Sequence, residues 1–339
     1  MEDIYTDTLR GILADHCGLD VVRDIEAGRP AEPLWQAIED SGFSDVLVPE
    51  AEGGAGLGLA DAFALLELCG IFIVPFPLAE TMLARALLAR AGLPRPSGSI
   101  ALATARRLAD GGWICDAVSC GRTAAWVLVD TGGTDALLLP ADAATCGEAV
   151  GKLDASMTWS AQAQRAAMTV RIATDIRTWQ ACLTAVQLAG ALGEVFTRTL
   201  AFANERQQFG RPIGKFQAIQ HQLSVMAEHV CAARMAAQLG CSGPAPDRLR
   251  VAIAKARTGE AALAVAALSH AIHGAIGFTA EFDLQMFTRR LHAWRQTAGS
   301  EGYWQDVLGS ALLAHAGHLT LDLLRATTDV ALTPTKEHA

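Results

Sequence analysis

The segment 202–220 separates two long amphipathic helices and constrains the fold more than any other part of the chain. It reads Phe-Ala-Asn-Glu-Arg-Gln-Gln-Phe-Gly-Arg-Pro-Ile-Gly-Lys-Phe-Gln-Ala-Ile-Gln. Two glycines and a proline therefore lie between a helix expected over 178–204 and another expected over 215–239. Two long helices joined by so short a break are expected to lie side by side, so the sequence predicts a helical bundle.

The break also places a cation beside free backbone donors. Arg206 carries a planar guanidinium whose donors suit a phosphate group. The helix that starts near Phe216 brings unpaired amides and about half an elementary positive charge at its N-terminus. The pattern predicts a site for a phosphate or pyrophosphate. The alternative for Arg206 is an ordinary salt bridge on the helix surface.

Composition and charge argue against several other classes of protein. The chain of 339 residues has 51% hydrophobic residues, but no apolar run reaches about 18 residues without a charge or a break, and its N-terminus is acidic. We therefore expect no signal peptide and no membrane span. The net charge of −9 argues against nucleic acid as a partner. The eight scattered cysteines lack the spacing of metal ligands, so we expect no metal site and reduced, mostly buried thiols in a cytoplasmic protein.

Hydrophobic periodicity divides the chain into three parts. Residues 1–97 predict a helical domain, residues 98–173 a small β domain and residues 174–339 a helical bundle. The expected fold class is therefore α+β, mostly α. The expected helices are 5–16, 33–41, 59–70, 78–91, 178–204, 215–239, 247–273, 284–294 and 301–330, and the expected strands are 99–104, 113–118, 124–130, 136–139 and 168–172.

Three motifs, in order along the chain, resemble those of the acyl-CoA dehydrogenase family. The first lies in 35–56, and the second is the Arg-x-x-Phe-Gly-x-Pro-Ile-x-x-Phe-Gln-x-x-Gln pattern that starts at Arg206. The third is the His-Gly-Ala-Ile-Gly-Phe-Thr turn of 273–279. The resemblance implies the family's fold, with a C-terminal four-helix bundle. It also implies FAD as cofactor, an acyl-CoA substrate and an electron-transferring flavoprotein as electron acceptor.

The resemblance further implies a role for this chain at a shared flavin. In the family each FAD lies at a subunit interface, and one chain contributes residues to the pyrophosphate and adenosine of a flavin held mainly by its neighbour. The matching positions are Arg206, Phe209, Gly210, Gln217, His273, Gly274 and Gly277. For His273 the alternative is a satisfied core histidine. The middle domain departs from the family, because 103–110 replaces the loop that normally holds the flavin ring.

Acyl-CoA dehydrogenation needs a carboxylate base that removes the α-proton of the thioester. Counted from Gly277, the family's glutamate falls on Ala298, which cannot accept a proton. The second position used in the family falls within 178–182, which contains no glutamate. Asp175 is expected to cap a helix, so Glu301 is the remaining candidate base, displaced from the family position.

Retained flavin contacts and a missing base predict the non-base subunit of a heteromeric acyl-CoA dehydrogenase. The resemblance is to the heterotetramers of bacterial steroid side-chain degradation, in which a full-length catalytic subunit would carry the glutamate. The acyl group would then be bulky and polycyclic. Two alternatives stay open: a self-sufficient homotetramer with Glu301 or Asp175 as a relocated base, and a non-catalytic scaffold without flavin.

Overall fold

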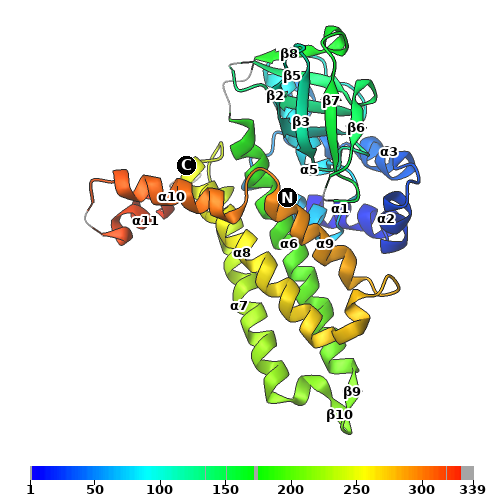
Figure 1. The fold of residues 1–339 in the computed structure, drawn as a ribbon, viewed down its shortest axis with the longest axis vertical. Coiled ribbons are helices and arrows are strands. Elements are labelled where there is room, and N and C mark those ends of the chain that lie inside the picture. The colour runs from blue at the N-terminus through cyan, green and yellow to red at the C-terminus, as the bar shows by residue number, and fades with distance from the viewer. Residues whose placement is uncertain (1, 134, 150, 172–174, 318, 330–339) are drawn as a thin grey trace, which may run out of the picture.

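The computed structural model describes residues 2–133, 135–149, 151–171, 175–317 and 319–329 (Figure 1). The β region lies at one end of the long axis and the β9–β10 hairpin at the other, with the long helices running between them. The described residues therefore confirm the expected α+β class with mostly helical structure. The predicted boundary at residue 173 lies outside the described residues.

The N-terminal part is helical, as predicted, but contains one helix that the sequence did not indicate. Leu19–Glu26 forms this helix, which has eight residues and two buried side chains, Val22 and Ile25. The helices of this part are α1 (Glu2–His16), α2 (Leu19–Glu26), α3 (Glu32–Ser41), α4 (Phe63–Ile71) and α5 (Leu78–Arg90), with 3₁₀ turns at Phe43–Asp45 and Glu50–Glu52.

Two glycines allow α4 to cross α6 (Ile176–Glu205) at very short range. A Cβ atom on Gly70 would lie 1.9 Å from the carbonyl oxygen of Gln187, and one on Gly190 would lie 2.2 Å from that of Glu67. Both distances are too short for any side chain, so the crossing requires glycine at both positions. This contact joins the N-terminal helices firmly to the bundle.

The β region consists of two four-stranded sheets around a second apolar core. The first sheet has the order β1 (Ile100–Thr104), β4 (Trp126–Asp130), β5 (Asp135–Pro140) and β8 (Met168–Arg171), and the second has the order β2 (Arg106–Arg107), β3 (Trp113–Val118), β7 (Ala155–Trp159) and β6 (Thr145–Gly147). Only β1 and β4 pair in parallel among the described strands. The five predicted strands are present, and β2, β6 and β7 were missed.

The C-terminal part is built on α6, α7 (Gln217–Gly240), α8 (Arg248–His273) and α9 (Leu284–Gln296). Asp247 caps α8, because its Oδ1 accepts hydrogen bonds from the amides of Leu249 and Arg250 at 3.0 Å. The single helix expected over 301–330 was wrong. Two helices, α10 (Glu301–Ala314) and α11 (Thr320–Thr328), stand there with Gly317 between them, and they form an arm that projects sideways from the bundle (Figure 1).

The segment Arg248–Phe278, which contains α8, is long and apolar enough to cross a membrane by length and composition. Its surroundings give another reason for that composition. Helix α8 packs against α6, α7, α9 and α10, and it carries the fully buried Lys255. Apolar side chains such as Val251 and Val265 therefore lie in the core of the bundle, whereas Leu263 is 40% exposed.

The eight cysteines are all free thiols. Six of them are buried, as the sequence predicted for most, whereas Cys146 and Cys231 are exposed. Cys231 departs from the expectation of mostly buried thiols, because it lies on an outward-facing part of α7. Burial raises the pKa of the Cys17 and Cys69 thiols to about 12, so these groups stay protonated at neutral pH.

Candidate functional site

The β9–β10 hairpin, Gln207–Gln208 paired with Arg211–Pro212, connects α6 to α7 at the far end of the bundle (Figure 1). Its two turn residues, Phe209 and Gly210, have φ angles of 52° and 76°. Two consecutive positive φ angles are typical of the tight hairpin turn that glycine favours. This turn leaves the Phe209 ring 91% exposed.

Arg206 is the residue that caps α6, and its amide donates to the carbonyl of Phe202 at 2.9 Å. The guanidinium is exposed and forms no hydrogen bond or ion pair with any residue that the structure describes. The alternative of a helix-surface salt bridge is therefore wrong for the described chain. Gln217, the first residue of α7, is also exposed, and no side chain caps that helix at Phe216.

Between the hairpin and the end of α8 lies an apolar pocket of about 320 Å³. It brings together three of the predicted residues, Arg206, Phe209 and His273, whereas Gln217 does not line it. Sequence analysis did not assign its other members to the site, because apart from the polar Gln208 they are ordinary aromatic or aliphatic residues whose only signal is their closeness in sequence to Arg206 or His273. These are Phe202, Gln208, Ile213, Phe216, Ile219 and Ile272.

His273 lines this pocket, and one of its two ring nitrogens is buried without a hydrogen-bond partner among the described residues. Its ring stacks on Phe202 with centroids 4.2 Å apart, and its Nδ1 lies 2.8 Å from the carbonyl oxygen of Ser269. Burial lowers the pKa of His273, so the neutral form is favoured. Since a carbonyl only accepts, Nδ1 carries the proton and Nε2, which is buried without a partner, is an acceptor. The alternative that His273 is a core histidine with both ring nitrogens hydrogen-bonded is therefore wrong among the described residues. The unpaired Nε2 could accept a hydrogen bond from an N–H or O–H group of a ligand.

The turn after α8, Gly274–Phe278, depends on two of the predicted glycines. Gly274 has φ 66° and ψ −148°, a combination that residues with a side chain rarely adopt. A Cβ atom on Gly277 would lie 3.0 Å from the Cβ of His273 and 3.2 Å from Nδ1 of His270. The glycines thus let the turn pack closely against both histidines.

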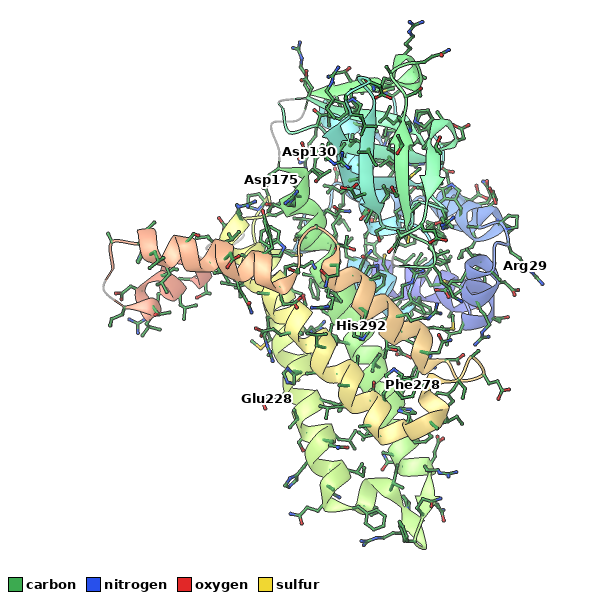
Figure 2. The ribbon with its side chains drawn as sticks, viewed as in Figure 1. Arg29, Asp130, Asp175, Glu228, Phe278 and His292 are labelled. Atoms are coloured by element: carbon green, nitrogen blue, oxygen red, sulfur yellow. The ribbon has the colours of Figure 1, made fainter. Side chains whose placement is uncertain are left out.

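His270 and Phe278 form the outer side of the same turn. Nε2 of His270 lies 2.9 Å from Oγ1 of Thr288, and its ring stacks on Phe278 at 4.1 Å. Burial is the main cause that lowers the pKa of His270. Phe278 is 69% exposed and lies near the turn that leads into α9 (Figure 2). Exposed aromatic rings therefore occur on both the hairpin and this turn.

The position at which the sequence resemblance predicts the family's base, Ala298, lies in a turn between α9 and α10. Ala298 is half-buried there with φ 58°, and Gly299 follows with φ 112°. The Nζ atom of Lys255 donates to the carbonyl oxygens of Trp294 and Arg295 at 2.9 Å and of Gly299 at 3.1 Å. A buried amine therefore fixes the turn that carries the methyl group of Ala298.

Glu301 is held through one of its carboxylate oxygens, whereas its Oε2 is buried without a hydrogen-bond partner among the described residues. It forms an ion pair and hydrogen bond with Arg295. Burial alone would raise the pKa of Glu301, but the hydrogen bond and charge of Arg295, together with the charge of Lys255, lower it. A carboxylate whose charged form is stabilised in this way is a weaker base.

Asp175 is the N-cap of α6, as predicted. Its Oδ1 accepts from the amide of Thr178 at 3.2 Å, and its Oδ2 accepts from Arg248 at 2.7 Å. Burial would raise the pKa of Asp175, but the bonds from Thr178 and Arg248 lower it. Both carboxylate oxygens are thus engaged in holding the helix start.

Glu80 is a buried carboxylate that sequence analysis missed. Its Oε2 accepts a hydrogen bond from the amide of Leu102 at 2.8 Å. Its Oε1 accepts one at 3.1 Å from the side chain of Gln180, which lies in the segment 178–182 considered above for a second base position. Burial raises the pKa of Glu80 to about 7. Because both oxygens are bonded and the side chain is 4% exposed, Glu80 ties α5 to β1 and α6 rather than facing a substrate.

The segment 103–110, which we expected to stand in place of the family's flavin-ring loop, closes onto the second sheet. It contains β2, in which Arg106 pairs with Ile114 and Arg107 with Trp113 of β3. The guanidinium of Arg107 lies 5.3 Å from the centre of the Trp113 ring. The segment is therefore paired within the β region and provides no extended loop for a ring.

Comparison with known proteins agrees with the motifs and the fold. The family profile described as "Acyl-CoA dehydrogenase, C-terminal domain" matches residues 170–313. Acyl-CoA dehydrogenase IpdE2 of Mycolicibacterium smegmatis is 31% identical over 314 residues, which cover 88% of this chain and 94% of the relative.

Two solved structures are similar over most of both chains. The Tcur3481-Tcur3483 steroid ACAD G363A variant has a TM-score of 0.78 and 25% identity over 93% of this chain and 99% of that chain. The ChsE4-ChsE5 complex from Mycobacterium tuberculosis shares the fold, with a TM-score of 0.77 and 19% identity over 93% and 98% of the two chains. With its motifs, its fold and a relative matched along nearly the whole length, this chain belongs to the acyl-CoA dehydrogenase family.

Proposed function

We propose that this chain is the non-base subunit of a heteromeric, FAD-dependent acyl-CoA dehydrogenase. One observation supports the proposal: the position expected for the base is Ala298, in a turn held by Lys255, while Arg206 and His273, which line the hairpin pocket, have side-chain nitrogens without partners among the described residues. On this proposal the chain would have lost the proton acceptor and kept groups that suit a ligand. A partner acyl-CoA dehydrogenase subunit would supply the glutamate.

The residues present at the hairpin pocket fit part of FAD. The guanidinium of Arg206 suits a pyrophosphate oxygen, and the unprotonated Nε2 of His273 suits an amine or hydroxyl donor of the adenosine half. Phe202, Phe209 and Phe216 offer aromatic faces for a flat purine. Gly210, Gly274 and Gly277 would shape the two turns, and Gln217 would contribute from the start of α7.

When bound, FAD supplies the hydride acceptor of the dehydrogenation, and this chain's residues would contribute binding rather than proton transfer. Arg206 would neutralise phosphate charge at the subunit interface, and His273 would fix the orientation of the adenosine half. The exposed rings of Phe209 and Phe278 would lie against the partner chain and exclude water there. The acyl-CoA would bind in the partner's site, where the base removes the α-proton.

The similar proteins favour this assembly and a steroid-type substrate. The ChsE4-ChsE5 structure is a complex, and the Tcur3481-Tcur3483 protein is described as a steroid ACAD. By analogy, two copies of each chain would form a heterotetramer that acts on a bulky polycyclic acyl-CoA in the cytoplasm and passes electrons to an electron-transferring flavoprotein.

The first experiment measures flavin content. The chain is purified alone and with a full-length acyl-CoA dehydrogenase from the same organism, and the FAD absorbance is compared with the protein concentration. We expect a colourless lone chain and a yellow complex with half as many flavins as chains. A lone chain that carries one flavin each and oxidises an acyl-CoA would instead show the self-sufficient homotetramer.

A matched pair of variants separates flavin binding from folding. Arg206→Ala removes an exposed guanidinium without an intrachain partner, so the complex should form normally but lose flavin on dilution. Loss of one charge-assisted contact weakens FAD binding by about tenfold or more. The control is Arg10→Ala, an equally exposed arginine on α1. Equal flavin retention by the complexes of both variants would contradict a flavin contact by Arg206. It would favour the alternative that this chain is a non-catalytic scaffold and that the flavin is held without it.

A further inference from the structure

Two histidines lie close together in the last turn of α8, and each has a buried ring nitrogen without a hydrogen-bond partner. These atoms are Nδ1 of His270 and Nε2 of His273, judged against the residues that the structure describes. A neutral imidazole carries one N–H, whereas a protonated imidazole carries an N–H on both nitrogens. Acid therefore gives each ring a second donor, and at each ring one of the two donors has no acceptor.

The turn Gly274–Phe278 covers both rings. The Phe278 ring stacks on the His270 ring with centroids 4.1 Å apart. Gly277 is the buried residue of the turn, and a Cβ atom there would lie 3.0 Å from the Cβ of His273 and 3.2 Å from Nδ1 of His270. While the turn holds this position, it keeps water from the two unpartnered nitrogens.

The charged groups on the neighbouring helices do not favour a protonated pair. His292 on α9 opposes a charge on His270 (Figure 2). On α6, Arg206 lines the same pocket as His273, and Arg198 is paired with a glutamate of its own helix. The turn itself has no titratable side chain, and α7 contributes an isoleucine to the pocket. Positive charge on these groups repels a protonated ring.

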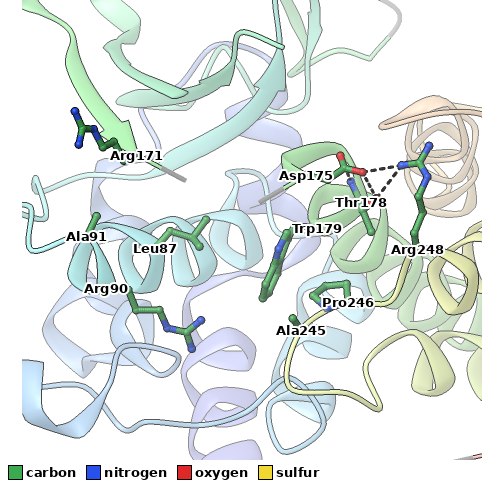
Figure 3. A pocket seen from close by; sticks show the side chains of 10 residues that line it. All are labelled: Leu87, Arg90, Ala91, Arg171, Asp175, Thr178, Trp179, Ala245, Pro246 and Arg248. Atoms are coloured by element: carbon green, nitrogen blue, oxygen red, sulfur yellow. Dashed lines mark hydrogen bonds and ion pairs between the residues drawn. The ribbon is translucent and has the colours of Figure 1, made fainter. Parts of the chain in front are cut away.

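The carboxylates that follow the turn do not offset this repulsion. Asp283 is paired with Arg23 at 2.7 Å, and Glu281 is exposed. Neither histidine forms an ion pair within the described chain, where the contacts of their ring nitrogens are to a hydroxyl and a carbonyl oxygen. By contrast, Asp175 at the other end of α6 has its counter-ion, Arg248, at 2.7 Å (Figure 3).

Protonation is therefore costly while the turn covers the rings. Burial is the main cause that lowers the pKa of both histidines, although the Ser269 carbonyl and the C-terminus of α8 act in the opposite direction. Once the turn moves away, water solvates both rings and their pKa returns toward the ordinary 6.5. The open turn then binds more protons than the closed one. The closed turn is thus stable above about pH 6.5 and loses stability as the pH falls below it.

The turn has little packing to lose when it opens. Ala275, Ile276 and Phe278 are exposed even while it is closed, Ile276 by 47%. Gly274 joins the turn to α8 with φ 66° and ψ −148°, and glycine at this joint can adopt other backbone angles at low cost. Opening therefore sacrifices mainly the stacking of Phe278 on His270.

We propose that His270 and His273 form an acid-sensitive switch: their neutral rings hold the turn Gly274–Phe278 closed, and protonation of both rings releases it. Because His273 also lines the hairpin pocket, release removes one wall of that pocket and weakens whatever binds there. The switch acts on the fold around the pocket whether or not the pocket binds flavin, and its test uses no cofactor.

Nuclear magnetic resonance of the full-length chain, with isotope-labelled histidine side chains, measures both titrations from about pH 7.5 to about pH 5. Two charges that appear under a closed turn repel each other, so titration in place gives each ring a Hill coefficient of one or less. Release of the turn exposes both rings together, so the first proton favours the second. We therefore expect Hill coefficients above one at His270 and His273, with a shared midpoint below the ordinary value.

Two variants and a second measurement make the test specific. His270→Gln keeps a hydrogen-bonding side chain that does not titrate, so His273 should then show a Hill coefficient of about one. His221→Gln, at an exposed histidine on α7, should leave both curves unchanged. Helical circular dichroism should persist through the transition, because only the turn opens.

Three outcomes would overturn the proposal. They are Hill coefficients of one or less at both histidines, cooperativity of His273 that survives in His270→Gln, and a midpoint that coincides with loss of the helical signal, which would mean unfolding of the whole chain. If His270→Gln failed to fold, the wild-type titration and its circular dichroism would still decide.

Discussion

The buried Lys255 predicts how the stability of this protein depends on pH. Burial lowers the pKa of Lys255 from 10.5 to about 7, against the opposing charge of Glu301. In the unfolded chain the amine keeps the higher value, so between about pH 7 and about pH 10 the unfolded state binds more protons. The free energy of unfolding therefore rises with pH over this window. Replacement of Lys255 by Met, a side chain of similar length, should remove that rise.

The magnitude follows from the two pKa values. Each pH unit within the window changes the free energy of unfolding by about 1.4 kcal/mol, less near the folded pKa, where the amine is half protonated. From about pH 7 to about pH 8.5 the wild-type chain should therefore gain about 1.5 kcal/mol relative to Lys255→Met. Cysteine thiols of the unfolded chain begin to ionise in the same range, so only the difference between the wild type and Lys255→Met isolates the contribution of Lys255.

Urea unfolding followed by circular dichroism at the two pH values measures this difference. The control is Lys215→Met, which removes an exposed lysine and should keep the wild-type pH dependence. Three carbonyl oxygens surround Nζ of Lys255, and they would favour the charged ammonium if their attraction exceeded the cost of burial. If the free energy of unfolding depended on pH in the same way in the wild type and in Lys255→Met, the carbonyl oxygens would outweigh the cost of burial. That result would refute the prediction that Lys255 loses its proton in the folded state near pH 7.

Two further predictions concern the helix crossing and the base position. Gly190→Ala should lower the free energy of unfolding by at least about 2 kcal/mol, because its Cβ would lie 2.2 Å from the Glu67 carbonyl oxygen. Gly193→Ala, three residues on with nothing within 4 Å, should raise it by about 0.5 kcal/mol, and equal effects in urea unfolding would contradict the close crossing. Ala298→Glu should not give the lone chain dye-reducing activity with octanoyl-CoA, because the flavin-ring loop is also missing; measurable activity would show that the base alone was lacking.

The long, periodic elements were predictable from sequence. Helices α6, α7 and α8 were predicted to within two residues at each end, and β3 was predicted at its observed bounds. Short elements were not, because α2 has only eight residues and β2 only two, too few for a period to show. The sequence prediction ran one helix across 301–330, whereas the structure has Gly317 between α10 and α11.

The candidate site was predictable only in part. The motif at 206–220 and the turn at 273–279 identified residues that the fold does bring together, such as Arg206 and His273. The Lys255 contact with Gly299 and the Glu80 contact with Gln180 join residues 44 and 100 positions apart. Such pairings leave no local pattern, so no reading of spacing or periodicity could have found them.

The apolar side chains exposed on the α10–α11 arm and at the hairpin end affect how a cell would treat this chain when no other protein covers them. The arm exposes Leu313 by 90% and Leu319 by 63%, and the far end of the bundle exposes Phe209 by 91% and Phe278 by 69%. Apolar side chains left in water at two separate sites attract chaperones and proteases and favour aggregation. A cell that made this chain in excess of any protein covering those surfaces would degrade the surplus. Matched synthesis rates, more than any property of the active site, would then set how much enzyme accumulates.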